Sequence, residues 1–130
     1  MKAQESTENY LETIYILGKG GGYVRSVDVS SHLNYSRPSV SVAMKKLRAD
    51  GYVDIDDKGA ITLTESGQKI AESIYERHVV ISDWLIFLGV DSQTAVDDAC
   101  RMEHVISDKS FEAIKKHVIN WKQEVYARKP

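Results

Sequence analysis

The order of secondary structure in this chain is clearest in residues 26–63, which read SVDVSSHLNYSRPSVSVAMKKLRADGYVDIDDKGAITL. Apolar residues at helical spacing predict a short helix that ends at Asn34-Tyr35. Ser36 is a favoured N-cap type, and Pro38 is tolerated in the first turn of a helix, so a second helix is expected up to Asp50-Gly51. Two short helices joined by a tight turn are typical of a helix-turn-helix.

The apolar pattern changes its period after this second helix. Tyr52, Val53 and Ile55 alternate as in a strand, and Ile61 and Leu63 predict a second strand. The polar segment between them has the turn chemistry of a hairpin. Helix, turn, helix and hairpin in this order predict a winged helix-turn-helix.

Helical spacing also predicts helices outside this segment. One covers residues 5–17 and ends in a glycine cluster, and a long one runs from Thr64 to Leu88. Two more are expected at about 92–106 and 108–118, and no element is assigned to the tail from Trp121 to Pro130. The predicted fold is mainly α with a small β-hairpin wing: a winged-helix domain at residues 1–70 followed by a helical domain at residues 71–130.

Length and composition limit the class of protein. The chain has 130 residues, of which 42% are apolar and 28% are charged, which suits one compact domain or two small helical layers. The longest apolar run, around Trp84–Leu88, is far too short to cross a bilayer. A single cysteine, Cys100, forms no internal disulfide, and the polar N-terminus does not resemble a secretory signal. These features predict a cytoplasmic protein that does not contact a membrane.

Positive charge is concentrated around the helix-turn-helix. Residues 25–48 hold five Lys or Arg residues against one Asp, whereas the whole chain has a net charge of -2. Such a stripe suits phosphate contact, and an Arg and hydroxyls at a helix start suit phosphates or base edges. The simpler alternative is a solvated face, and two aspartates in the wing oppose DNA contact. The candidate DNA-binding residues are Arg25, Ser36, Arg37, Pro38, Ser39, Ser41, Val42, Lys45, Lys46 and Lys58.

A second cluster has the donor types of a metal site. Cys100, Glu103 and His104 stand at positions i, i+3 and i+4 of one predicted helix, so that a thiolate, a carboxylate and an imidazole share one face. This mixed set suits a divalent transition ion and not calcium or magnesium. Further donors are available from His78 and from Asn9 and Glu12. Taken singly, each residue also has a structural explanation: a buried thiol, a histidine bonded to a carbonyl, or a solvated acid.

The run DACRMEHV at residues 98–105 is similar to the metal-ligand segment of the diphtheria-toxin-repressor and manganese-transport-regulator family of metal-dependent repressors. Other segments resemble the same family in the same order. They are TENYLETIY at 7–15, SRPSVS at 36–41, LTESG at 63–67 and Arg77-His78.

The resemblance implies a dimeric winged-helix repressor that controls metal-ion homeostasis, with metal ions bridging a DNA-binding part and a helical metal-binding and dimerisation part. Operator DNA, in double-stranded form, and a second copy of the chain are then the expected partners, with no small organic substrate. The ligand positions of the family fall on Glu12, His78, Cys100, Glu103 and His104. Asn9 also occupies a ligand position, where a neutral amide oxygen is a weaker donor than the usual Asp or Met.

Departures from the family pattern bear on the choice of metal. Cys100 is like the iron-responsive branch, whereas Glu12 is like the manganese branch. A thiolate favours Fe²⁺, Co²⁺ or Zn²⁺, and the oxygen donors also suit Mn²⁺, so we expect Fe²⁺ narrowly over Mn²⁺, with Zn²⁺ or Co²⁺ binding in vitro. Ser82 and Val96 replace ligands of an ancillary site, which is expected to be absent. The chain is also expected to be a short form that lacks the SH3-like domain of many members.

Two further expectations concern specificity and assembly. Val42 stands where the iron branch has a base-contacting Gln, so the operator of that branch does not transfer. The apolar residues Trp84, Leu85, Phe87 and Leu88 exceed what a monomeric surface helix requires and predict part of a dimer interface. The alternative function is a metal-independent winged-helix module that binds DNA or protein and has a structural Cys/His/Glu cluster. A metallohydrolase is disfavoured because no catalytic motif such as HExxH occurs, and the chain is not expected to be an enzyme.

Overall fold

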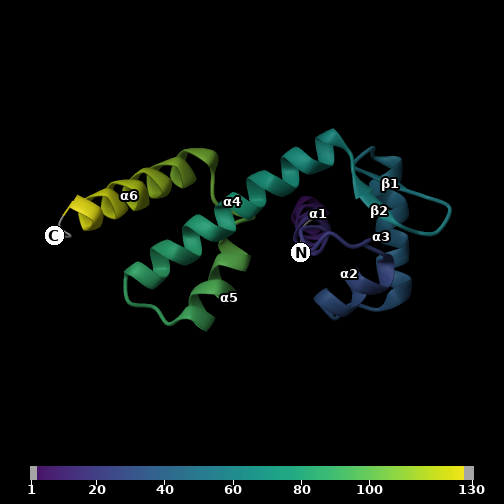
Figure 1. Cartoon of the computed structure of the whole chain (residues 1–130), viewed down its shortest axis with the longest axis horizontal. Coiled ribbons are helices and arrows are strands. Elements are labelled where there is room, and N and C mark those ends of the chain that lie inside the picture. The colour runs from purple at the N-terminus through teal and green to yellow at the C-terminus, as the bar shows by residue number, and fades with distance from the viewer. Residues whose placement is uncertain (1–2, 128–130) are drawn as a thin grey trace. The chain divides into compact units, whose positions relative to one another are not determined.

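The structure, a computed structural model, describes residues 3–127 and divides into two compact units, one up to Ser73 and one from Ile74 onward (Figure 1). In chain order the elements are α1 (Ala3–Gly18), α2 (Ser26–Leu33), α3 (Arg37–Ala49), β1 (Val53–Ile55), β2 (Ile61–Leu63), α4 (Glu65–Phe87), α5 (Ser92–Met102) and α6 (Asp108–Ala127). The prediction of a mainly α fold with a hairpin wing is confirmed. The outer ends of the predicted domains, residues 1–2 and 128–130, lie outside the described residues.

The turn between α2 and α3 forms as its sequence predicts. Asn34 adopts a left-handed conformation with φ 57°, and its backbone N–H donates to the carbonyl of Ser30. The Ser30 hydroxyl donates to the carbonyl of Tyr35 at 2.6 Å. Ser36 then caps α3, because its hydroxyl accepts a bond from the Ser39 backbone N–H at 3.3 Å. Local hydrogen bonds therefore fix where α3 begins.

The wing is a two-stranded antiparallel hairpin in which Val53 pairs with Leu63 and Ile55 with Ile61. Asp56 closes its loop: one carboxylate oxygen accepts from the backbone N–H groups of Lys58 and Ala60, each at 2.9 Å. This acid is used by the loop itself, as in an Asx turn.

The core of the first unit is formed by apolar side chains of its helices and strands. Val40, Met44 and Leu47 form the buried stripe of α3. They pack with buried residues of the other elements, which are Tyr10, Leu11, Ile14, Val24, Val29, Val53, Ile61 and Ala71. Gly67 allows the start of α4 to approach the chain closely, since a Cβ there would lie 2.1 Å from the carbonyl oxygen of Tyr52.

The second unit differs from the predicted boundaries in two places. The predicted helix that ends near Ile106 stops at Met102, and the helix predicted to end near Val118 continues to Ala127. In that extension, which includes the first seven residues of the unassigned tail, Trp121 packs on Phe87 with ring centroids 3.9 Å apart, and Lys122 pairs with Asp83 at 3.0 Å. The C-terminal half of α6 therefore packs against α4. Among the described residues, none of the helices is long and apolar enough to cross a membrane.

Candidate metal centre

A buried carboxylate lies at the end of α5. Glu103 is the C-cap of this helix, with φ −60° and ψ −26°, and its side chain is only 1% exposed. The sequence predicted that Cys100, Glu103 and His104 share one helix. That prediction was wrong in part: Cys100 lies on α5, while Glu103 is its cap and His104 lies in the following turn.

The two oxygens of Glu103 face two imidazoles. Oε2 lies 2.9 Å from Nδ1 of His78 on α4, within hydrogen-bond distance. Oε1 lies 3.3 Å from Nε2 of His104, whose side chain is 6% exposed. His78 of α4 and His104 of the turn after α5 therefore place ring nitrogens beside the two oxygens of one carboxylate.

The thiol of Cys100 lies at the outer side of this group. Its Sγ is 3.8 Å from Nδ1 of His78, the same nitrogen that faces Glu103. The His78 ring also lies parallel to that of Tyr75, with centroids 6.5 Å apart. Sulfur, nitrogen and oxygen donors from α4, α5 and the following turn thus meet within the second unit.

The environment of His78 strongly favours its protonated form. Hydrogen bonds to the Cys100 thiol and to the Glu103 carboxylate raise the pKa of His78 from 6.5 to about 10, against the opposing effect of burial. In the metal-free protein a proton therefore supplies the positive charge that the buried carboxylate requires.

The donor set fits a divalent transition ion. A carboxylate, two imidazoles and a thiol are the ligand types that such ions select, and calcium or magnesium would prefer oxygen alone. Oε1 of Glu103 is buried and makes no hydrogen bond to any described residue, although the His104 nitrogen lies nearby. An ion would satisfy this oxygen and replace the proton on His78.

Arg77 positions the turn that carries Glu103, a role that the sequence did not reveal. Its guanidinium is almost fully buried, and Nη1 donates to the carbonyl oxygens of Glu103 at 3.2 Å and Ile106 at 2.6 Å. Nη2 pairs with Asp108 at the start of α6, and Cζ lies 5.2 Å above the ring of Phe111. One side chain therefore satisfies the carbonyls at the end of α5 and fixes the path to α6.

The sequence also singled out Asn9, Glu12, Ser82 and Val96. Asn9 and Glu12 are on α1 in the first unit, one turn apart, and Glu12 is buried. The Ser82 hydroxyl donates to the carbonyl of His78, and Val96 is 38% exposed. The expected absence of an ancillary site at these two positions stays a prediction.

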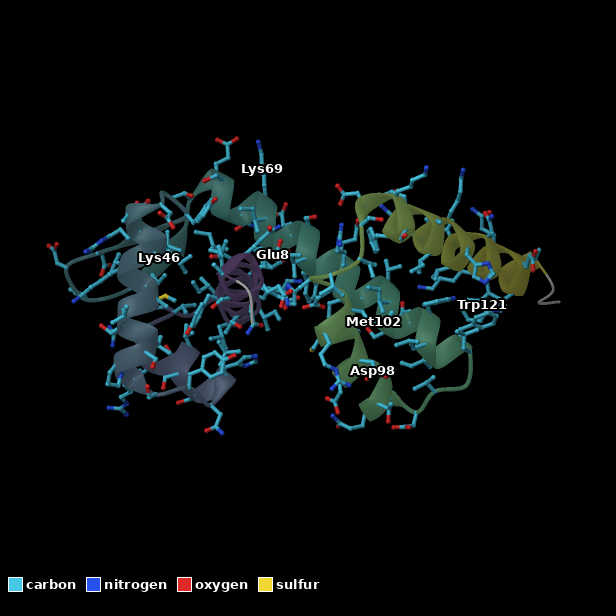
Figure 2. All side chains as sticks on the ribbon, turned by 180° about the vertical axis from the view of Figure 1, so that it is seen from behind. Glu8, Lys46, Lys69, Asp98, Met102 and Trp121 are labelled. Atoms are coloured by element: carbon cyan, nitrogen blue, oxygen red, sulfur yellow. The ribbon has the colours of Figure 1, made fainter. Side chains whose placement is uncertain are left out.

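The candidate DNA-binding residues of α3 lie on its exposed surface, where Figure 2 marks Lys46. They are Arg37, Pro38, Ser39, Ser41, Val42, Lys45 and Lys46, and Ser36, Arg25 and Lys58 are also exposed. Among the dimer candidates, Phe87 and Leu88 are 38% and 58% exposed, whereas Trp84 and Leu85 are half-buried.

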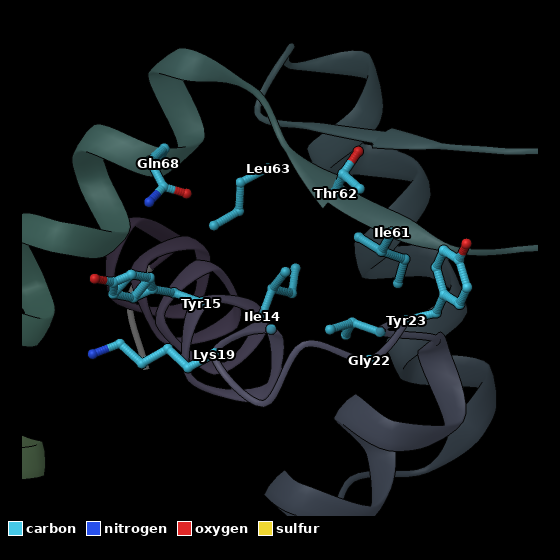
Figure 3. A pocket seen from close by; sticks show the side chains of 11 residues that line it. Ile14, Tyr15, Lys19, Gly22, Tyr23, Ile61, Thr62, Leu63 and Gln68 are labelled. Carbon is cyan, nitrogen blue, oxygen red and sulfur yellow. The ribbon is translucent and has the colours of Figure 1, made fainter.

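The first unit contains a pocket whose lining differs in chemistry from the candidate metal centre. It has a volume of about 340 Å³ and lies between α1, the segment before α2 and β2 (Figure 3). Ile14, Ile61 and Leu63 form apolar walls, and Lys19 is the charged residue among its described lining. Because that lining has no carboxylate, imidazole or thiol, the pocket is not a candidate metal site.

Comparison with known families covers nearly the whole chain. Residues 2–61 match the N-terminal DNA binding domain of the iron dependent repressor family, and residues 64–127 match its metal binding and dimerisation domain. The HTH-type transcriptional regulator MJ0568 of Methanocaldococcus jannaschii is 36% identical over 123 residues, which are 93% of this chain and 98% of that protein. The transcriptional regulator MntR of Escherichia coli O157:H7 is 32% identical over 112 residues, or 86% of this chain and 72% of that protein.

Solved structures give the same result. A manganese-dependent transcriptional repressor in complex with manganese has a TM-score of 0.80 and 27% identity over 86% of this chain, and the manganese regulator SloR has 0.77 and 29% over 86%. The chain spans about half the length of these two, at 52% and 53%. The resemblance inferred from the DACRMEHV run is confirmed, as is the prediction of a transcriptional regulator and not an enzyme.

Replacing Arg77 with Met should destabilise the second unit and loosen Glu103. The substitution keeps the volume but leaves buried carbonyls without donors, which should cost about 2–3 kcal/mol in the free energy of unfolding. Urea denaturation and a metal titration should both show the loss. The matched control is Lys115→Met, which breaks only the partly exposed pair with Glu76 and should change the free energy by less than about 0.5 kcal/mol. Equal effects of the two variants would contradict this role for Arg77.

Metal binding should strengthen as pH rises. The raised pKa of His78, about 10, means that its proton is bound below that pH and must leave before the ring nitrogen coordinates an ion. The raised pKa also affects the stability of the metal-free fold. The His78–Glu103 pair stabilises that fold fully below pH 6.5, and this stabilisation is lost as pH rises through about 10. Apparent affinity should therefore rise about tenfold per pH unit for each proton displaced.

A chelator-competition titration at several pH values below 10 measures this slope. His32→Gln, at an exposed position of α2, should keep the slope of the original chain. An affinity that does not change with pH would mean that the ion does not replace a proton at His78.

Proposed function

The chain belongs to the iron-dependent repressor family of metal-dependent transcriptional regulators, and on this basis we propose that it represses transcription when a divalent metal ion binds around Glu103. The observation that carries the proposal is the buried Glu103 carboxylate between the imidazoles of His78 and His104. The proposed regulator acts on metal-ion homeostasis in the cytoplasm, with the ion as its co-repressor.

The proposed ligands are His78, Cys100, Glu103 and His104, all from the second unit. Two observations support these ligands. The four donor side chains converge on one place, and Glu103 among them is almost fully excluded from water. We extend the ligand set to Glu12, a buried carboxylate of α1, and more weakly to Asn9, whose amide oxygen is neutral. The support for these two is the family resemblance of the segment that contains them.

The mechanism follows from differential affinity. The side chains around Glu103 would hold the ion, whose positive charge would balance the buried carboxylate, and the arrangement of the chain that presents the most donors would be favoured. A ligand from α1 would then couple the metal centre to the helix that packs against α2 and β2 in the DNA-binding unit. Such coupling shifts the population towards the arrangement that binds DNA, and DNA binding in turn tightens metal binding.

The proposed DNA-binding domain comprises residues 1–70, and the proposed metal-binding and dimerisation domain comprises residues 71–130. Residues 2–61 match a DNA binding domain, and the exposed positive charge of α3 favours duplex DNA as its ligand. Ser36, Arg37 and Ser41 are proposed phosphate contacts at the start of α3, with Lys58 on the wing and Arg25 before α2. We propose that Lys45 and Lys46 follow the DNA backbone farther along α3.

The proposed oligomer is a homodimer, which the match of residues 64–127 to a dimerisation domain favours. Leu88 offers the most exposed apolar surface of the predicted interface, while Phe87 is partly covered by Trp121. Trp84 and Leu85 complete the proposed contact. Light scattering of the metal-loaded chain should give twice the mass of 14.6 kDa, and a monomer at high concentration would contradict the dimer.

The metal preference rests on Cys100. Two of the similar solved structures are named as manganese-dependent or manganese regulators, yet the sulfur of this chain lies beside the His78 nitrogen. A thiolate donor favours Fe²⁺ over Mn²⁺, so we propose Fe²⁺ as the preferred ion, with Mn²⁺ next and with Zn²⁺ or Co²⁺ binding in vitro.

Glu103→Gln tests the function. The variant keeps the shape of the side chain but removes the charge, so the fold should remain while metal-stimulated operator binding falls by more than about 100-fold. His104→Ala should have the same effect. Fluorescence anisotropy with duplex DNA, selected by the metal-loaded chain, measures the change. The control Glu112→Gln, at an exposed position of α6, should bind like the original chain. Metal-dependent binding that survives in Glu103→Gln would contradict the assigned centre, and DNA binding that ignores metal throughout would favour the metal-independent module.

Cys100→Glu should reverse the metal preference. An oxygen donor replaces the sulfur at an exposed position, so the ratio of Fe²⁺ to Mn²⁺ affinity should fall about tenfold or more. Anaerobic competition titrations at buffered free metal measure this ratio. A ratio that is unchanged would show that the thiol is not a ligand.

A further inference from the structure

The outward face of the recognition helix has an apolar centre. Val40, Met44 and Leu47 are the buried stripe of α3. At 3.6 residues per turn, Val42 lies almost opposite this stripe, with Pro38 and Ala49 nearest to it on the outward side. Val42 is 69% exposed, one of the highest values among the large apolar residues described. The positions that would project farthest into a DNA groove therefore have no side-chain hydrogen-bonding group.

Polar residues flank this centre on both sides. By the same helical spacing, Arg37, Ser41 and Arg48 lie along one flank, and Ser39 and Lys46 lie along the other. Lysine and arginine on both flanks suit the two phosphate backbones that border a groove. Ser39 is already engaged, because its hydroxyl accepts a bond from the Ser36 hydroxyl at 2.8 Å. The most central and exposed side chain of the face is thus a branched hydrocarbon in a basic surrounding.

The chemistry of base edges limits what such a side chain can recognise. Guanine, cytosine and adenine are distinguished in the major groove by hydrogen-bond donors and acceptors, which valine cannot pair. The C5-methyl group of thymine is the apolar feature of that groove. A Val42 methyl placed against a guanine or adenine edge would instead desolvate polar atoms without replacing their bonds.

We propose that Val42 determines specificity by contacting the C5-methyl group of a thymine in each half of the operator. The inference rests on the proposed function, because it requires duplex DNA on the exposed face of α3. It specifies an A·T pair at the base that faces the second turn of α3.

The experiment removes one methyl group at a time. Duplexes are first selected from a random library by the metal-loaded chain, and each thymine of the selected site is then replaced with deoxyuridine, which keeps its hydrogen bonds and lacks the methyl. Each half-site should contain one thymine whose single replacement weakens binding about fourfold, which is the effect of losing one buried methyl-sized group. Binding is measured by anisotropy at fixed salt and saturating metal.

The variant Val42→Ala identifies the side chain responsible. It should bind the thymine and deoxyuridine duplexes equally at that position, because the contact is already lost. The matched control Val27→Ala removes the same atoms from an exposed valine of α2 and should keep the fourfold discrimination. Two results would overturn the inference and leave the proposed function intact. Val42→Ala could still discriminate thymine from deoxyuridine, or the original chain could bind its selected site equally well after every replacement. Failure to select any duplex with metal present would contradict the proposed function itself.

Discussion

A carboxylate that is removed from water needs positive charge close to it, and this constraint governs the second unit. Glu103 is 1% exposed, and its oxygens lie 2.9 Å from His78 and 3.3 Å from His104. Hydrogen bonds to Cys100 and to Glu103 raise the pKa of His78 to about 10, so in the metal-free protein the protonated His78 supplies that charge. A divalent ion would supply the same charge once the proton of His78 has left.

The position of the Glu103 carboxylate also depends on Arg77, a cation that bonds to the backbone of the turn and not to the carboxylate. Arg77 binds the carbonyls of Glu103 and Ile106 and thereby orders the turn between α5 and α6. His78 follows Arg77 on α4. Arg77 therefore holds the backbone of the turn, while His78 contacts the side chain of Glu103. This adjacency links the packing of the unit to its chemistry: a loss of order in the turn would move Glu103 and His104 together.

The first unit was predictable because its signals are local. Ser36, Pro38 and the left-handed Asn34 fix the ends of α2 and α3 within a few residues, and the change of period marks the wing. The end of α5 was not predictable in this way. Residues 103–107 contain no Gly or Pro, and the helix stops where Arg77, 26 residues before Glu103, bonds to the Glu103 carbonyl. The donor types of the metal centre could be found from helical spacing, whereas the buried role of Arg77 and the length of α6 depend on contacts distant in sequence.

The most direct measurement is anomalous diffraction from anaerobic crystals of the chain loaded with Fe²⁺. We expect a metal peak about 2 Å from the Glu103 carboxylate and from Nδ1 of His78, with the Cys100 sulfur within bonding distance. A peak elsewhere in the molecule, with His78 and Glu103 still bonded to one another, would contradict it.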